Sequence, residues 1–231
     1  MNRIAIAAVL AGLALPAAAA DTRESRTVSG FHALSMGAVL DVDVIQDGTE
    51  SLSLEGDAEV LSRIETAVRE GTLEFRYKPD TRIHSHGRVH AVVHARDMDS
   101  IAISGAGNVR SASLKADSLR LAISGSGDVG IDRVAAKQTS LAISGSGNMT
   151  LAGTAEELKA RISGSGSIKA ARLETQRADV GISGSGNATV WAKQNLATAI
   201  AGVGNVRYYG DPAVAKTVRG VGHVERVAAN P

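Results

Sequence analysis

Residues 143–148 read Ile-Ser-Gly-Ser-Gly-Asn, and close copies of this hexapeptide return through the C-terminal half of the chain. Consecutive copies start 18 to 20 residues apart. The seven copies start at Ile103, Ile123, Ile143, Ile162, Ile182, Ile200 and Val218. A repeat of nearly fixed length is typical of a stacked architecture, in which each unit buries its apolar edge against its neighbours.

Apolar residues alternate with small or polar ones on both sides of each copy, as at Leu141 and Ile143 before the turn and Met149 and Leu151 after it. This period of two predicts short strands with one face inward. Two or three strands fill a unit of 18–20 residues and leave no room for a helix. We therefore predict an all-β fold, a parallel β-helix (β-solenoid) of about seven coils, right-handed by the general preference of parallel crossovers.

Glycine occupies two fixed positions in all seven copies, so 14 of the 25 glycines serve one corner. Glycine takes positive φ without steric cost and leaves room for layers about 4.8 Å apart. Asn or Asp follows in five copies, where vertical stacking predicts a ladder of side chains. The predicted structural turn residues are Gly105, Gly107, Asn108, Gly125, Gly127, Asp128, Gly145, Gly147, Asn148, Gly164, Gly166, Gly184, Gly186, Asn187, Gly202, Gly204, Asn205, Gly220 and Gly222.

Three chemical interpretations of the motif are disfavoured by their context. Residues 125–130 match GxGxxG, but they open no helix of a βαβ unit, as dinucleotide binding requires. Asp128 is the one acidic residue that follows the second glycine, which is too few for calcium at every turn. No His or carboxylate recurs at a fixed distance from the serines. We assign no catalytic residue and no cofactor.

The first 20 residues have the pattern of a secretory signal peptide. Arg3 precedes an apolar run over residues 4–15, and small residues follow up to Ala20. We expect cleavage before Asp21 and export to the periplasm, the cell surface or the medium. Because no second long apolar run follows, we expect no transmembrane segment in the mature chain.

The rest of the chain divides into segments by its sequence pattern. Residues 21–98 predict strands and one α-helix over about 57–70, with Asp57 as its N-cap and Gly71 closing it. This segment is expected to cap the solenoid, because an open end of parallel strands invites aggregation. The coils are expected over residues 99–227, followed by a short tail over residues 228–231.

At the other end, Lys216 and Arg226 fall at nominally inward positions. Two interpretations stay open: a frayed last coil that other strands avoid, or an end that meets a second subunit in a homo-oligomer. Cleavage removes Arg3, which leaves 24 of the 25 basic residues against 24 acidic ones. That balance argues against nucleic acid as a partner.

Four of the six histidines gather at His84, His86, His90 and His94. Their even spacing places them on one face of a continuous strand, where neutral imidazoles are able to bind zinc, copper or nickel. The alternative is a solvated polar face. His90 and His94 are expected to lie about 13 Å apart, too far to share one ion without further ligands.

The signal peptide, the segment from Phe31 to Val44, the single helix and the repeated coils together resemble the bacterial family "putative auto-transporter adhesin, head GIN domain". The resemblance covers residues 28–227 and is most specific in the repeated hexapeptide. It implies a parallel β-helix, and it implies no catalytic residues.

Three functions follow from these observations. We favour an exported, non-enzymatic envelope protein that presents a rigid surface for binding or adhesion, with a protein or glycan ligand. A polysaccharide lyase or hydrolase is the first alternative, because parallel β-helices host such enzymes, although the acidic residues here share no coil position. A periplasmic structural or stress-related partner protein is the second.

Overall fold

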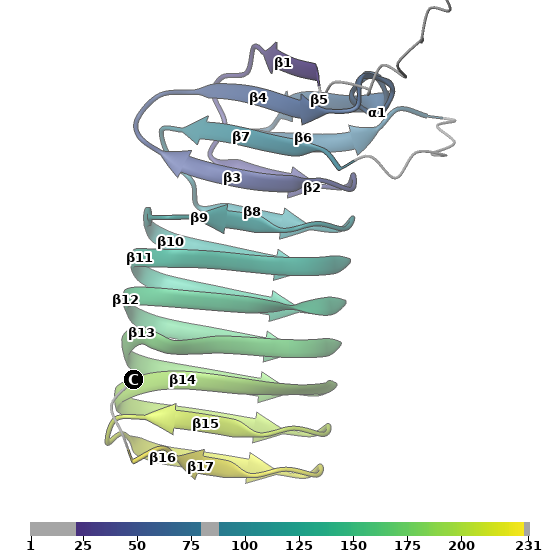
Figure 1. Ribbon diagram of the computed structural model, residues 1–231. Coiled ribbons are helices and arrows are strands. Elements are labelled where there is room, and N and C mark those ends of the chain that lie inside the picture. Colours follow the sequence, from purple (N-terminus) through teal and green to yellow (C-terminus); the bar gives the residue numbers. More distant parts are fainter. Residues whose placement is uncertain (1–21, 80–87, 229–231) are drawn as a thin grey trace, which may run out of the picture.

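The computed structural model describes residues 22–79 and 88–228. Figure 1 shows one column of rungs, with the N-terminal strands at the top and the C-terminal strands at the bottom. The N-terminal elements are β1 (Thr22–Arg26), β2 (Ala33–Met36), β3 (Asp41–Gln46), β4 (Ser51–Gly56), α1 (Ala58–Arg63), β5 (Ile64–Arg69), β6 (Thr72–Tyr77) and β7 (His90–Ala95). The column continues through β8 (Ser100–Ile103), β9 (Val109–Ser111), β10 (Leu114–Ile123), β11 (Ser126–Ile143), β12 (Ser146–Ile162), β13 (Ser165–Ile182), β14 (Ser185–Ile200), β15 (Val206–Tyr209), β16 (Ala213–Val218) and β17 (Val224–Arg226).

The repeated motif stacks in register. Ile123 pairs with Ile143, and Ile143 pairs with Ile162, in parallel ladders between successive coils. The predicted all-β parallel solenoid is therefore confirmed. The predicted number of coils is slightly too high, because the seven glycine corners between Ile103 and Val218 bound only six complete turns.

Columns of aliphatic side chains fill the interior. The isoleucine of the motif is buried in the first six copies, and so is the residue two positions before it. A further column, four positions before the isoleucine, is also buried and was not predicted from the sequence. It consists of Leu119, Thr139, Leu158, Ala178 and Leu196. Burying one Leu or Ile side chain contributes about 1.5–3 kcal/mol, so these columns supply the main driving force for stacking.

Differences in coil length are absorbed away from the glycine corner. The register between β11 and β12 shifts by one residue between Ile131 and Val134, close to Gly153. The register between β13 and β14 shifts after Ala170 and again after Thr175. As a result, coils of 18 to 20 residues keep their glycine corners aligned.

The N-terminal strands extend the same stack before they close it. β2 pairs in parallel with β8, and β3 with β9. β6 and β7 form the next layer, on β2 and β3. β4 and β5 then pair antiparallel with β7 and β6, and β1 adds antiparallel to β4. The change to antiparallel pairing ends the stack at this side.

The helix predicted over residues 57–70 is too long. The side chain of Asp57 accepts from the backbone N–H groups of Glu59 and Val60, but α1 ends at Arg63 and β5 follows directly. The spacing of Ile64 and Val68 fits a helix stripe and a strand face equally well. Pairing with β6 decides for the strand, because the turn after β5, with φ of 49° at Glu70 and 73° at Gly71, folds the segment back as a hairpin.

At the opposite end, β16 pairs with β14 in parallel and is exposed at all six residues. Lys216 lies beside Thr198 of the preceding coil, at an inward position. The last coil is thus a formed strand with no layer beneath it among the described residues.

Candidate functional site: the glycine corner

Backbone layers approach closely at the corner. A Cβ atom placed on Gly145 would lie 2.0 Å from the carbonyl oxygen of Gly125, and one on Gly147 would lie 1.9 Å from that of Gly127. Every corner glycine from Gly125 onward meets a carbonyl of the preceding layer in the same way. Positive φ, the other reason expected for these glycines, applies at Gly107, with φ of 129°, but not at Gly145. Close approach is therefore the common physical cause.

Side chains at the position after the second glycine form a vertical ladder. The Asn148 backbone N–H and Nδ2 both donate to Asp128 Oδ1, at 2.8 and 2.9 Å. The Asp128 N–H donates to Asn108 Oδ1 at 3.1 Å, and Asn108 in turn donates to Asp41 at 2.8 and 2.9 Å. The ladder thus extends into the N-terminal strands and fixes the outer edge of the corner.

A second ladder segment lies further down the column. Asn205 donates to Asn187 Oδ1 from its backbone N–H at 3.0 Å and from Nδ2 at 3.2 Å. The His223 N–H donates to Asn205 Oδ1 at 3.0 Å. Ser167 occupies the position between the two segments. The second segment borders the concave surface described next.

We call this surface the corner groove. It has a volume of about 640 Å³ and is lined by the corner glycines of the last coils together with Ser167, Ser185, Asn187, Val203, Asn205, Val221 and His223. Two of its valines are strongly exposed, Val203 at 56% and Val221 at 70%. Among the residues that line it, none is Asp, Glu, Lys or Arg. The groove therefore combines amide and hydroxyl groups with a neutral, partly apolar wall.

The apolar part of this groove was not predicted from the sequence. The residue between the two glycines is Ser in the four middle copies and Val at Val203 and Val221. An apolar side chain between two glycines of an exposed turn is the signal that indicates an outward valine. Neighbouring coils bring these two valines into adjacent layers, where they form an isolated β-bridge.

A smaller hollow of about 300 Å³ lies beside the upper ladder, between Asn108, Asp128 and Asn148. Arg110 and Lys169 also line it. It differs from the corner groove in having charged side chains of both signs. The carboxylate of Asp128 is already engaged in the ladder.

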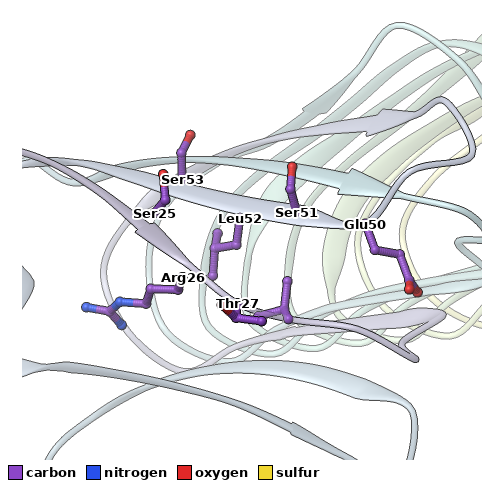
Figure 2. A pocket seen from close by; sticks show the side chains of 8 residues that line it. Ser25, Arg26, Thr27, Glu50, Ser51, Leu52 and Ser53 are labelled. Atoms are coloured by element: carbon purple, nitrogen blue, oxygen red, sulfur yellow. The ribbon is translucent and has the colours of Figure 1, made fainter.

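A third hollow, of about 330 Å³, lies beside β1 and β4 near the N-terminal end (Figure 2). Arg26 and Glu50 point to opposite ends of it. Arg26 donates to the carbonyl oxygens of Ile64 at 2.8 Å and Leu61 at 3.0 Å, and Glu50 accepts from the Gly30 N–H at 3.1 Å. These charged side chains hold β1 and the following loop in place, which indicates a structural role.

The histidine cluster is only partly within the described residues, because His84 and His86 lie outside them. His90 Nε2 is 3.0 Å from Asp43 Oδ2, and His94 Nδ1 is 2.7 Å from Asp47 Oδ2. The two histidines thus face different carboxylates. Residues 22–79 and 88–228 hold no group of three His, Cys, Asp or Glu side chains arranged to ligate a metal.

Asp47 is the carboxyl group whose pKa is most clearly perturbed in this region. Hydrogen bonds from the side chain and the backbone N–H of Thr49, together with His94, lower the pKa of Asp47 from 3.8 to about 2. The Thr49 hydroxyl donates to Asp47 Oδ1 at 2.7 Å. This arrangement keeps Asp47 ionised and closes the loop between β3 and β4.

Comparison with known proteins places the chain in a family. The family model "Putative auto-transporter adhesin, head GIN domain" matches residues 30–212. The chain belongs to this family. No curated protein matches it significantly.

Several solved structures share the fold. A putative adhesin from Bacteroides fragilis has a TM-score of 0.84 at 22% identity, over 90% of this chain and 97% of that one. A putative lipid binding protein from Parabacteroides distasonis has a TM-score of 0.71 at 20% identity, over 90% and 97%. A putative adhesin from Parabacteroides merdae has a TM-score of 0.68 at 22% identity, over 90% and 96%. At these identities the likeness establishes the fold. Separately, the described helix is too short and too polar to span a membrane.

Proposed function

We propose that this protein is an exported, non-enzymatic binding protein of the bacterial envelope or cell surface, and that it holds its ligand in the corner groove. The single observation that carries the proposal is the groove itself, a hollow with a volume of about 640 Å³ on the stacked coils. The family description and the solved structures called putative adhesins also support a binding role.

The chemistry of the groove favours a neutral glycan chain. Asn187 and Asn205 use Oδ1 within the ladder and still offer side-chain N–H groups. Ser167 and Ser185 offer hydroxyls, and the exposed valines offer an apolar wall for the faces of sugar rings. Such a combination of an apolar surface with a few polar groups is typical of small-ligand sites. Successive coils repeat these groups about every 4.8 Å, which suits an extended polymer.

The division of the chain belongs to the same proposal. Residues 1–20 are a signal peptide that is removed, residues 21–98 cap the solenoid, and residues 99–227 present the binding surface. N-terminal sequencing of the protein from its native cell tests the first part. A mature chain that starts at Asp21 supports export, and a chain that retains residues 1–20 contradicts it.

The binding experiment uses purified residues 21–231 on an array of neutral and charged envelope glycans. Ser185→Tyr fills the groove, so we expect it to weaken binding at least tenfold. Ser146→Tyr makes the same change at the equivalent exposed corner position two coils earlier, outside the groove, and should leave binding unchanged.

Two results would contradict the proposal: no binding to any glycan on the array, or equal loss in both variants. Reducing-end and unsaturated-product assays on the bound glycan distinguish binding from the lyase or hydrolase alternative. We expect the glycan to be recovered intact.

A further inference from the structure

The C-terminal end of the column is an open sheet edge. β16 pairs with β14, and no other strand of the described residues pairs with it. In a parallel ladder alternate residues bond to the neighbour on each side. Every second residue of β16 therefore presents an N–H and a C=O group that no described residue satisfies. Such an edge is a template for another strand.

Exposed apolar side chains concentrate at the same end. Of the six large apolar side chains exposed in the described part of the chain, four lie in the last two coils: Val203, Val214, Val218 and Val221. Val214 and Val218 continue the buried columns of Leu196 and Ile200 by one layer, but they are 38% and 42% exposed. A further strand would bury them as the preceding layers bury their neighbours.

The edge also carries positive charge. Lys216 stands between the two valines of β16 on the inward side, and it has no hydrogen bond or ion pair with any described residue. Residues 206–228 hold four basic and two acidic side chains, a net charge of +2. A strand that covers this edge therefore needs an acidic residue opposite Lys216, flanked by apolar residues two positions away on each side.

We propose that the β16 edge binds an extended, acidic strand of a partner protein by β-augmentation, with a carboxylate opposite Lys216. Backbone hydrogen bonds supply the affinity, and the alternation of apolar, acidic and apolar side chains supplies the specificity. This interaction is independent of the corner groove, and either site is able to work without the other.

The charges disfavour a second copy of this chain as the occupant. In a tail-to-tail pair about a twofold axis, β16 would lie antiparallel to β16 of the other copy. Placing Val214 opposite Val218 then brings the two Lys216 side chains together, and like charges directly opposite each other are destabilising. A lipid surface is disfavoured for another reason: it does not satisfy the unpaired N–H and C=O groups of the edge.

The test uses the ¹⁵N-labelled mature chain and two synthetic peptides, Thr-Val-Thr-Glu-Thr-Val-Thr and the same peptide with Lys in place of Glu. We expect the Glu peptide to shift the amide resonances of β16 and to bind about fivefold more tightly than the Lys peptide. Lys216→Glu should reverse this preference. Lys159→Glu, the same charge change on an exposed residue of β12, should preserve it.

Four outcomes overturn the proposal. The first is that neither peptide shifts the amide resonances of β16, the second that both peptides bind equally, and the third that Lys159→Glu has the same effect as Lys216→Glu. The fourth outcome is that the protein without peptide is a dimer by light scattering or binds vesicles containing phosphatidylglycerol, while β16 is unaffected by peptide. Glycan binding by the corner groove is measured separately, so failure at the edge is distinguishable from failure of the proposed function.

Discussion

Gly145→Ala is the sharpest test of the stacked corner. The new methyl carbon would lie 2.0 Å from the carbonyl oxygen of Gly125 and 2.3 Å from that of Ser124. Ordinary contacts of this kind exceed 3.0 Å, so the two layers must separate locally by about 1 Å or more. Both atoms in the way are backbone atoms, and no side-chain rotation relieves the clash.

The separation would break hydrogen bonds across the corner. The Gly145 N–H donates to Ile123 O at 3.2 Å, and the Ser146 N–H donates to Gly125 O at 2.9 Å. Losing two such bonds at about 1 kcal/mol each, with some loosening of the buried isoleucines beside them, predicts a loss of about 2–4 kcal/mol in the free energy of unfolding.

Urea unfolding followed by far-UV circular dichroism measures the change, with the slope of the transition checked for constancy. Gly130→Ala is the matched control, because a Cβ atom on Gly130, in β11, meets nothing within 4 Å. We expect that variant to be neutral or stabilised by up to about 1 kcal/mol, since Gly is unfavourable within a strand. Equal stability of the two variants, or a loss below about 1 kcal/mol for Gly145→Ala, would refute the close-approach explanation.

Three further predictions concern polar groups. The Thr139 hydroxyl is buried without a partner among the described residues, so Thr139→Val should raise the free energy of unfolding in urea by about 1 kcal/mol. Thr175→Val removes a 2.7 Å hydrogen bond to a backbone carbonyl and should lower it by a similar amount. The pKa of Asp47 is lowered to about 2, so its stabilising contribution is complete above pH 3.8 and is lost as the pH falls through 2. Thr49→Val should move that pKa back towards 3.8 in a carboxyl NMR titration. Asp128→Ala removes the acceptor for two N–H groups of the next coil and should lower the unfolding free energy by about 1 kcal/mol, whereas Asp128→Asn, which keeps an acceptor oxygen, should lose less.

The architecture was predictable because the constraint that sets it repeats. Each close approach at the corner requires glycine, so the period of the sequence is the period of the stack. The N-terminal helix was predictable only at its start, where Asp57 provides a cap. Its end depends on pairing between β5 and β6, which the local spacing of Ile64 and Val68 does not reveal.

The interior and the candidate site were less predictable from the sequence. The column that contains Leu119, Thr139 and Ala178 was not predicted because its residue types vary from coil to coil, although the side chains are uniformly buried. The corner groove arises from valines in adjacent coils, and their exposure depends on the turn they occupy. Both features belong to the stack and not to any single repeat.

The register shifts near Gly153 and after Ala170 have a consequence for change in this fold. The corner demands the same turn in every coil, while the segments with register shifts, away from the corner, already accommodate coils of unequal length. New loops, whether acquired in evolution or introduced in the laboratory, are therefore best inserted in these segments, away from the corner. Each coil then offers a separate insertion site, and inserted loops in successive coils would be spaced by the distance between layers, about 4.8 Å.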